Sequence, residues 1–395
     1  MSTLDALNAS FGQGDALHFI TGPGGLTQAV LRAEGAEARV LLQGAQVVHY
    51  QPAGFGPVIW VSDEATFLTG KSVRGGVPVC WPWFGATTDG RPAHGFARNL
   101  MWQVANGGLE TGEVWLTLEL LPSEATRSFW PQDFRLSLEV RLGASLRLTL
   151  TTEHRGDAPC EITQGLHTYL RVGDIREAAI LGLVDTPFLD KTRDMIRDVQ
   201  HEQALRLTGE TDRIYLDTLA EVIVEDPVLH RRLHVRKEGS RSTVVWNPWE
   251  TKAGAFPDMR ADEYRHMLCV ETTNAGEDRV LLPPGGVHRL VSEIFASPLG
   301  CPRGTSCVGA APPRLFQKDC PVLLKLASSR YTPATGSENQ SLAVIDSRAS
   351  RPWLANPGCF SKSFETACPA AIGGRGIGPR AGLLQPFALP LGLRA

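Results

Sequence analysis

The sequence predicts an all-β protein, built as a sandwich or a barrel. In many short segments apolar and polar residues alternate, and Gly, Pro, Asn and Asp separate these segments, which is the pattern of half-buried strands joined by turns. Helical periodicity is scarce, so few helices are available to cover a sheet. The 395 residues are enough for one large domain of this class or for two ordinary ones.

The clearest strands form a predicted antiparallel meander. Apolar residues occupy alternate positions from Val114 to Leu120, from Phe134 to Leu142 and from Leu146 to Leu150. The same alternation continues through later segments as far as VSEIF, just before residue 297. Two short helices are predicted, at Asp63 to Leu68 and at Pro257 to Tyr264.

One stretch, Gly70 to Arg98, brings Arg74, His94 and Arg98 together with the pair Gly75-Gly76 and a Trp-Pro-Trp-Phe block. Glycines permit a close backbone approach or a positive φ, and tryptophans supply flat apolar walls. We interpret the stretch as a ligand-binding segment. The alternative is a loop-rich part of the core whose arginines face the solvent.

Charge and composition exclude several classes of protein. The formal net charge of −3 combines an acidic body, up to Pro298, with a basic remainder, and an acidic body does not suggest a nucleic-acid partner. The first residues lack the basic and apolar regions of a signal peptide, and no run of about eighteen apolar residues occurs. We therefore expect a cytoplasmic protein that binds neither nucleic acid nor membrane.

The character of the sequence changes after Ser297. Alternation disappears, Pro, Gly, Ser and Arg become frequent and acidic residues become rare. A segment of this composition buries too little apolar surface to offset the entropy of ordering it. We predict a sandwich domain over residues 1–297 and a low-complexity, disordered extension over residues 298–395.

The cysteines predict neither disulfides nor a zinc site. Cys80, Cys160 and Cys269 are far apart in the body and form no CxxC pair, so we expect reduced, buried thiols. The spacings of the five cysteines after residue 300 match no zinc pattern.

Two residues of the body stand out as candidates for acid–base chemistry. Glu271 lies in the apolar MLCVETTN segment, where a carboxylate is costly to bury unless it is hydrogen-bonded or used. His167 lies in the apolar GLHTYL segment. Each has a structural alternative, because such a glutamate is more often an ion-pair partner and such a histidine more often a hydrogen-bonded core residue. Together with His94 they could form a two-histidine, one-carboxylate metal site, but the HxH spacing of cupin-type sites is absent.

Other catalytic classes find no support in the motifs. No GxSxG segment is present, so serine hydrolysis is not indicated. Neither GxxxxGK[ST] nor GxGxxG precedes a predicted helix, so nucleotide binding is not indicated either.

Six motifs, taken in order, resemble those of a known family. They are GKSVRGGVPVCWPWFG, AHGFARNLMW, GLHTYLRVGD, TDRIY, VVWNPW and CVETTNA. This series is similar to that of the hexose-6-phosphate mutarotases, the YeaD-like branch of the aldose 1-epimerase superfamily, and the similarity runs from about residue 18 to residue 297. The resemblance implies a galactose-mutarotase-like β-supersandwich and an isomerase of carbohydrate metabolism. The extension after Ser297 has no counterpart in this family.

The resemblance also assigns roles to residues of the motifs. It makes His167 the general acid and Glu271 the general base. It places Arg74, His94 and Arg98 along a sugar-phosphate pocket, with Asp212 binding a sugar hydroxyl. The family often has Gln where this chain has Ala93, so one polar contact to the sugar is in doubt.

These residue types suit the exchange of α and β anomers. An acid and a base on opposite sides of the hemiacetal open the ring, C1 rotates, and the ring closes again, without cofactor or metal. The arginines suit a phosphate dianion, and Trp81, Trp83 or Trp246 could stack on the sugar while the others belong to the core. We expect a monomer acting on hexose 6-phosphates, glucose 6-phosphate first. The alternatives are an aldose 1-epimerase for unphosphorylated sugars and a non-catalytic sugar-phosphate-binding regulator.

Overall fold

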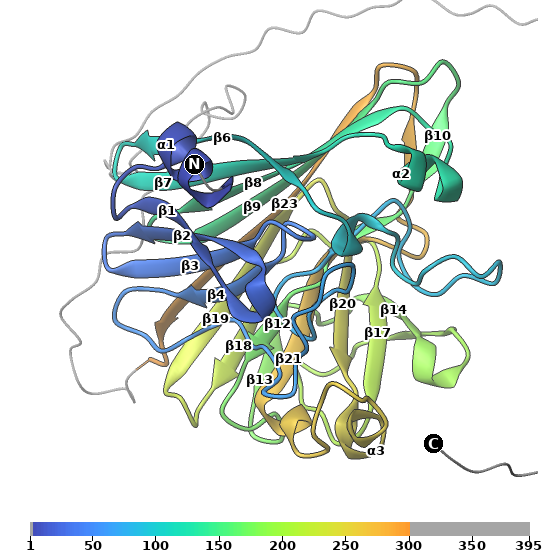
Figure 1. Ribbon diagram of the computed structural model, residues 1–395. Coiled ribbons are helices and arrows are strands. Elements are labelled where there is room, and N and C mark those ends of the chain that lie inside the picture. The colour runs from blue at the N-terminus through green and yellow to red at the C-terminus, as the bar shows by residue number, and fades with distance from the viewer. Residues whose placement is uncertain (1–2, 301–395) are drawn as a thin grey trace, which may run out of the picture. The chain divides into compact units, whose positions relative to one another are not determined.

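Two large antiparallel sheets dominate the computed structural model, which describes residues 3–300 (Figure 1). The all-β prediction is therefore confirmed. All pairings between named strands of these residues are antiparallel, which suits a chain whose strands follow one another through short turns. Nearly all of the predicted extension, residues 298–395, lies outside the described residues.

The larger sheet has nine strands and contains the predicted meander. In spatial order they are β16 (Ala204–Leu205), β13 (Ala179–Leu181), β18 (Val222–Asp226), β19 (Arg231–Glu238), β23 (Val287–Pro298), β9 (Leu146–His154), β8 (Phe134–Leu142), β7 (Glu113–Leu120) and β6 (Gln103–Glu110). Buried and half-buried residues alternate along β7, β8 and β9, as the sequence predicts. The strand that comes last in the chain, β23, lies between β9 and β19 near the middle of this sheet.

The second sheet has eight strands and carries most of the candidate site. Its strands are β15 (Ile196–Val199), β14 (Pro187–Asp190), β17 (Thr211–Tyr215), β20 (Ser242–Asn247), β21 (Met267–Asn274), β11 (Gln164–Leu166) and β5 (Val79–Cys80), with β12 (Tyr169–Arg171) also paired to β21. All eight residues of β21 are buried, polar ones included. This strand lies in the interior of the sheet, because β20 covers one edge while β11 and β12 share the other.

Two small sheets and a few short helices complete the described residues. Four strands form a separate sheet: β1 (Leu17–Thr21), β2 (Thr27–Ala33), β3 (Ala36–Leu41) and β4 (Val47–Gln51). A two-stranded ladder joins β10 (Cys160–Ile162) to β22 (Val280–Leu282). The α-helices are α1 (Thr3–Phe11), α2 (Glu124–Phe129) and α3 (Trp249–Gly254), and the 3₁₀ turns are η1 (Pro23–Gly25), η2 (Ala97–Asn99), η3 (Lys191–Arg193) and η4 (Glu263–His266). None of these helices is long and apolar enough to span a membrane.

The predictions of short helices at Asp63 to Leu68 and at Pro257 to Tyr264 are wrong. Asp63 to Leu68 contains no helix, and in the second segment only a 3₁₀ turn forms, from Glu263 onward. The two segments hold each other, because the Glu263 carboxylate accepts bonds from Ser62 Oγ at 2.8 Å and from the Asp63 N–H at 2.7 Å. Both captured groups lie at the start of the first segment, so a residue far away in the sequence fixes the path of the chain there.

A single hydrophobic cluster joins the inner faces of the two large sheets and the four-stranded sheet. Trp81 belongs to it: its side chain is fully buried, packs on Phe96 and Phe134, and donates to Thr152 Oγ1 at 3.0 Å.

Two glycines of the Gly70–Arg98 stretch allow close packing of the backbone. A Cβ on Gly75 would lie 2.5 Å from Val61 Cα, and one on Gly76 would lie 2.3 Å from the Val47 carbonyl oxygen. The close approach predicted for these glycines is thus to neighbouring backbone.

Candidate active site

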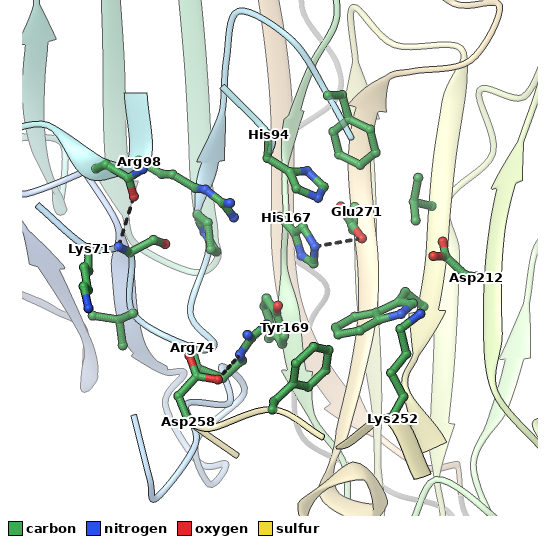
Figure 2. Close-up of a pocket in the computed structure, with 18 of the residues that line it drawn as sticks. Lys71, Arg74, His94, Arg98, His167, Tyr169, Asp212, Lys252, Asp258 and Glu271 are labelled. Carbon is green, nitrogen blue, oxygen red and sulfur yellow. Dashed lines mark hydrogen bonds and ion pairs between the residues drawn. The ribbon is translucent and has the colours of Figure 1, made fainter. Parts of the chain in front are cut away.

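A cavity of about 440 Å³ opens beside β21, and it brings together all six residues that the motifs single out (Figure 2). Its walls come from the Gly70–Asn99 region, the link between β11 and β12, and strands β17, β20 and β21. The predicted ligand-binding stretch therefore does line a cavity. Its arginines do not simply face the solvent.

His167 and Glu271 meet because β21 pairs with two consecutive strands. Leu166 of β11 lies opposite Thr272, and Tyr169 of β12 lies opposite Cys269, so the link between those strands passes over Glu271. His167 Nε2 is 3.5 Å from Glu271 Oε1. Figure 2 shows this pair near the centre of the cavity lining.

Burial governs the protonation of this pair. Desolvation raises the pKa of Glu271 well above its ordinary value. Desolvation lowers the pKa of His167 well below its own, and the nearby His94, Arg98 and Arg74 lower it further. Both shifts favour uncharged forms, a carboxylic acid beside a neutral imidazole. Glu271 Oε2 and His167 Nδ1 are buried and have no hydrogen-bond partner within residues 3–300.

His94 lies next to His167, with 5.5 Å between ring centroids. Its backbone has a φ of 61°, in the left-handed region. Burial, and then the charges of Arg98, Lys191 and Arg74, lower its pKa to about 3, so the ring is neutral. The Gly85 N–H donates to His94 Nδ1 at 3.4 Å, which leaves the proton on Nε2 as a donor for a ligand.

Gly165 leaves room for the ring of Phe84 beside this group. A Cβ at Gly165 would lie 2.9 Å from Phe84 Cε2. The Phe84 ring packs edge-on against His94, at 4.9 Å between centroids. His167 itself stacks on Tyr169, with centroids 4.8 Å apart.

The two predicted arginines differ in how they are held. Arg74 Nε donates to Asp258 Oδ1 at 3.1 Å, and its guanidinium lies over the Phe256 ring, 4.4 Å from the centroid. Arg98 donates only to the main-chain carbonyl of Ala93, at 2.8 Å, while its Nε is buried without a partner in the described part of the chain. The residue at position 93 thus contributes through its backbone. Arg98 retains unused donors and an uncompensated charge.

Asp212 is positioned by a residue that no motif marks. Lys191 Nζ, from η3, lies 2.8 Å from Asp212 Oδ2. The other oxygen, Oδ1, is buried and has no partner among the described residues. Burial raises the pKa of Asp212, and the Lys191 charge works against that rise. The result is a fixed carboxylate with one oxygen ready to accept a hydrogen bond from a ligand.

Of the three tryptophans considered for stacking, Trp246 lines the cavity and Trp81 belongs to the core. Trp83 is half-buried, donates to the Pro92 carbonyl at 2.8 Å and carries the Arg91 guanidinium over its ring, outside this cavity.

Sequence reasoning missed several lining residues, among them Lys71, Tyr169, Lys191, Lys252, Phe256 and Asp258. Lys71 could have been found, because it lies inside the Gly70–Arg98 stretch. Lys191 and Asp258 reach the site through contacts with residues distant in the sequence, Asp212 and Arg74, and no local sequence pattern predicts them. The predicted free thiols are confirmed for Cys80, Cys160 and Cys269, which are all buried.

The chain is similar in sequence to several known proteins. A family model described as aldose 1-epimerase matches residues 27–294. An Escherichia coli K12 protein, provisionally named glucose-6-phosphate 1-epimerase, is 40% identical over 253 residues, which cover 64% of this chain and 84% of that protein. A protein of Cenchrus ciliaris with the same provisional name is 35% identical over 273 residues, 67% of this chain and 82% of that one.

Solved structures share its fold. The crystal structure of YeaD from Salmonella typhimurium, provisionally described as a mutarotase, matches with a TM-score of 0.68 and 34% identity, covering 73% of this chain and 96% of that one. The galactose 1-epimerase of Lactobacillus acidophilus NCFM has a TM-score of 0.56 at 12% identity over 72% of this chain and 99% of that one, and so shares the fold.

Proposed function

The chain belongs to the aldose 1-epimerase family, and from this membership we propose that it interconverts the α and β anomers of hexose 6-phosphates, glucose 6-phosphate first. The observation that carries the proposal is the His167–Glu271 pair, which lies between a cationic end of the cavity and Asp212. An isomerase of sugar anomers needs an acid and a base at one carbon, and this pair supplies both.

The proposed reaction uses one proton held by the pair. A carboxylic acid beside a neutral imidazole contains as many protons as a carboxylate beside an imidazolium. Transfer of one proton from Glu271 to His167 therefore creates the base and the acid together. Glu271 then removes the proton of the C1 hydroxyl while His167 protonates the ring oxygen. The C1–O5 bond breaks, C1 rotates about the C1–C2 bond, and the same steps in reverse close the other anomer.

Substrate binding itself favours the charged form of the pair. The positive charges of Arg98 and Arg74 contribute to the low pKa of His167. A phosphate dianion bound to these arginines offsets their charge, so the pKa of His167 rises when the substrate is present. The phosphate would thus help to activate the acid as well as anchor the sugar.

The cationic end of the cavity supports a phosphate ester over a neutral sugar. Figure 2 shows Arg98 and Lys71 on one side of the catalytic pair and Asp212 on the other. Arg74 already has Asp258 as its partner, whereas Arg98 has only a carbonyl oxygen. We assign the principal phosphate contact to Arg98, with Lys71 beside it and Arg74 as a positioned neighbour. Asp212 Oδ1 would accept a sugar hydroxyl.

Magnetisation-transfer NMR of anomer exchange tests this proposal. We expect the wild-type protein to accelerate exchange of glucose 6-phosphate well beyond that of glucose. Arg98→Gln should raise KM for the phosphate ester by about 10- to 100-fold, the value of a hydrogen bond to a charged group, and should not slow the exchange of glucose. Arg197→Gln is the matched control, since Arg197 lies on β15 in an exposed pair with Glu277.

Two outcomes would contradict the proposal. Equal acceleration of both sugars would show that Arg98 does not recognise phosphate and would favour an epimerase of unphosphorylated aldoses. Saturable binding of glucose 6-phosphate without any acceleration would favour a non-catalytic binding protein.

A further inference from the structure

Three potential metal ligands converge at the centre of the cavity, and they are not the set that the sequence suggests. A ring nitrogen of His167, Cys269 Sγ and a carboxylate oxygen of Glu271 all lie within 4.8 Å of one another. Cys269 takes the place that His94 has in the sequence-based set. Cys269 and Glu271 are two residues apart on β21, so their side chains share one face.

The cluster is buried, and its polar atoms are not all used. The side chains of His167 and Glu271 are only 10% and 1% exposed. Glu271 Oε2 and His167 Nδ1 lack partners within residues 3–300, although buried polar atoms are usually hydrogen-bonded. Both residues line the cavity, so a small ion can reach them from it.

We propose that His167, Cys269 and Glu271 form a reversible inhibitory site for a thiophilic divalent cation such as Zn²⁺. Thiolate, imidazole and carboxylate are all common zinc ligands, and a water molecule or a sugar hydroxyl from the cavity completes a tetrahedron. With metal–ligand distances of about 2.0 to 2.3 Å, the ligand atoms need to approach one another by on the order of 1 Å.

Binding of the metal ion releases protons from its ligands. The S–H bond of Cys269 breaks as the thiolate binds, any proton on Glu271 leaves, and both go to solvent. Arg74, Arg98 and Lys191 would repel a dication here, whereas the thiolate and the carboxylate attract it. Softness of the ligands therefore decides selectivity. Mg²⁺, which prefers six oxygen ligands, is not expected to bind.

Inhibition follows from what the metal occupies. The lone pairs that would hold Zn²⁺ on His167 and Glu271 are those that the proposed reaction uses to move protons. This consequence rests on the proposed function. The metal site itself does not, and the first test below is independent of activity.

Absorption of bound Co²⁺ tests the site directly. The full-length wild-type protein should show a thiolate-to-Co²⁺ charge-transfer band that is reduced in Cys269→Ser. Cysteines beyond Gly300 are present in both proteins, so the difference between the spectra reports Cys269 alone. Cys80→Ser is the matched control, because it removes another buried thiol outside the cluster and should leave the spectrum unchanged.

Identical cobalt spectra for the wild type and Cys269→Ser would overturn the proposal. Far-ultraviolet circular dichroism checks that Cys269→Ser folds. If it does not, His167→Gln takes its place with the same readout: loss of that ligand should shift the cobalt bands, and unshifted bands count against the site.

Inhibition of anomer exchange tests the consequence. Zn²⁺ should inhibit the wild type and Cys80→Ser alike, a chelator should restore activity, and Mg²⁺ should have no effect. Cys269→Ser should weaken the apparent zinc affinity by more than about tenfold, since even outer-shell changes cost 10- to 100-fold. Equal zinc sensitivity of Cys269→Ser and wild type would refute the inhibitory role. Absence of any exchange, with the cobalt difference present, would refute the proposed function alone.

Discussion

Strand β8 in the nine-stranded sheet and strand β21 in the eight-stranded sheet have similar lengths but opposite designs. Along β8, fully buried residues alternate with partly exposed ones, and the buried positions are Phe, Leu and Val. Along β21 every residue is buried, and the second half is Glu, Thr, Thr and Asn. The comparison teaches that β8 contributes apolar burial, whereas β21 uses its buried positions to hold polar groups in place.

Two polar side chains at the end of β21 have hydrogen-bond partners, which makes the unpartnered atoms of the same strand informative. Asn274 accepts from Gln164 Nε2 at 2.9 Å, and Thr273 Oγ1 shares a hydrogen bond with Ser242 Oγ at 2.9 Å. Glu271 Oε2 and Thr272 Oγ1 have no partner in the described residues. An unsatisfied buried group costs about 1 to 3 kcal/mol. We infer that this cost is tolerated at Glu271 because the free oxygen meets the substrate.

The largest effect that we expect is a loss of activity when β21 is changed at Glu271. Glu271→Gln removes the proposed base while preserving side-chain size, so kcat/KM for glucose 6-phosphate should fall by about 10²- to 10⁴-fold. Anomer exchange measured by NMR checks this, with thermal unfolding as the control for folding. Near-normal activity of the variant would remove Glu271 from the mechanism.

The second prediction concerns the stability that β8 contributes. Leu138 of β8 is fully buried and lies between Leu118 and Leu150 on the neighbouring strands. Leu138→Ala should lower the free energy of unfolding by about 2 to 5 kcal/mol, through lost burial and a cavity. Urea unfolding gives this value. Activity per folded molecule should not change, and a large loss of kcat would show that the two sheets are coupled.

The third prediction concerns pH. In the folded state Glu271 holds its proton above the ordinary value of 4.5, where the unfolded chain has lost it. Stability contributed by this group therefore falls as pH rises from 4.5, and it levels off at the raised pKa. At that same pH the pair loses its last proton, so kcat/KM should begin to fall.

Urea unfolding and kcat/KM measured across pH test this coincidence. The difference in stability between wild type and Glu271→Gln isolates the contribution of Glu271. A stability difference independent of pH would contradict the raised pKa, and an activity that declines in another pH range would contradict the role of the shared proton.

The smallest effect belongs to the exposed face of β8. Arg135 contacts Glu119 and Glu153, on the two neighbouring strands, and its side chain is 37% exposed. Arg135→Gln should cost no more than about 1 kcal/mol, because water and salt screen such pairs. Urea unfolding at low and high salt measures it. A loss several times larger would mean that this ion-pair network is as important as the leucines beneath it.

The sequence predicts features that depend on local patterns and misses those that depend on contacts between distant residues. Strands β7, β8 and β9 were predictable because a period of two is a local property. Local alternation also placed Cys269 and Glu271 on one face. The segment Asp63 to Leu68, where the helix prediction was wrong, is held by Glu263, about two hundred residues away. Arg74 and Asp258 are likewise 184 residues apart in sequence. Contacts of this range leave no local pattern, so the partners of the site required the structure.

Strand β23 has a consequence for the time course of synthesis. It is the last strand of the described residues to leave the ribosome, yet it pairs with β9 on one side and β19 on the other. Until residue 298 has emerged, the meander of β7, β8 and β9 ends in an unpaired edge at β9, rich in leucine. Open edges of this kind pair with other chains, and nascent proteins are most exposed to aggregation at this stage. A pause in translation before β23 would therefore be more harmful to this protein than one of equal length after it.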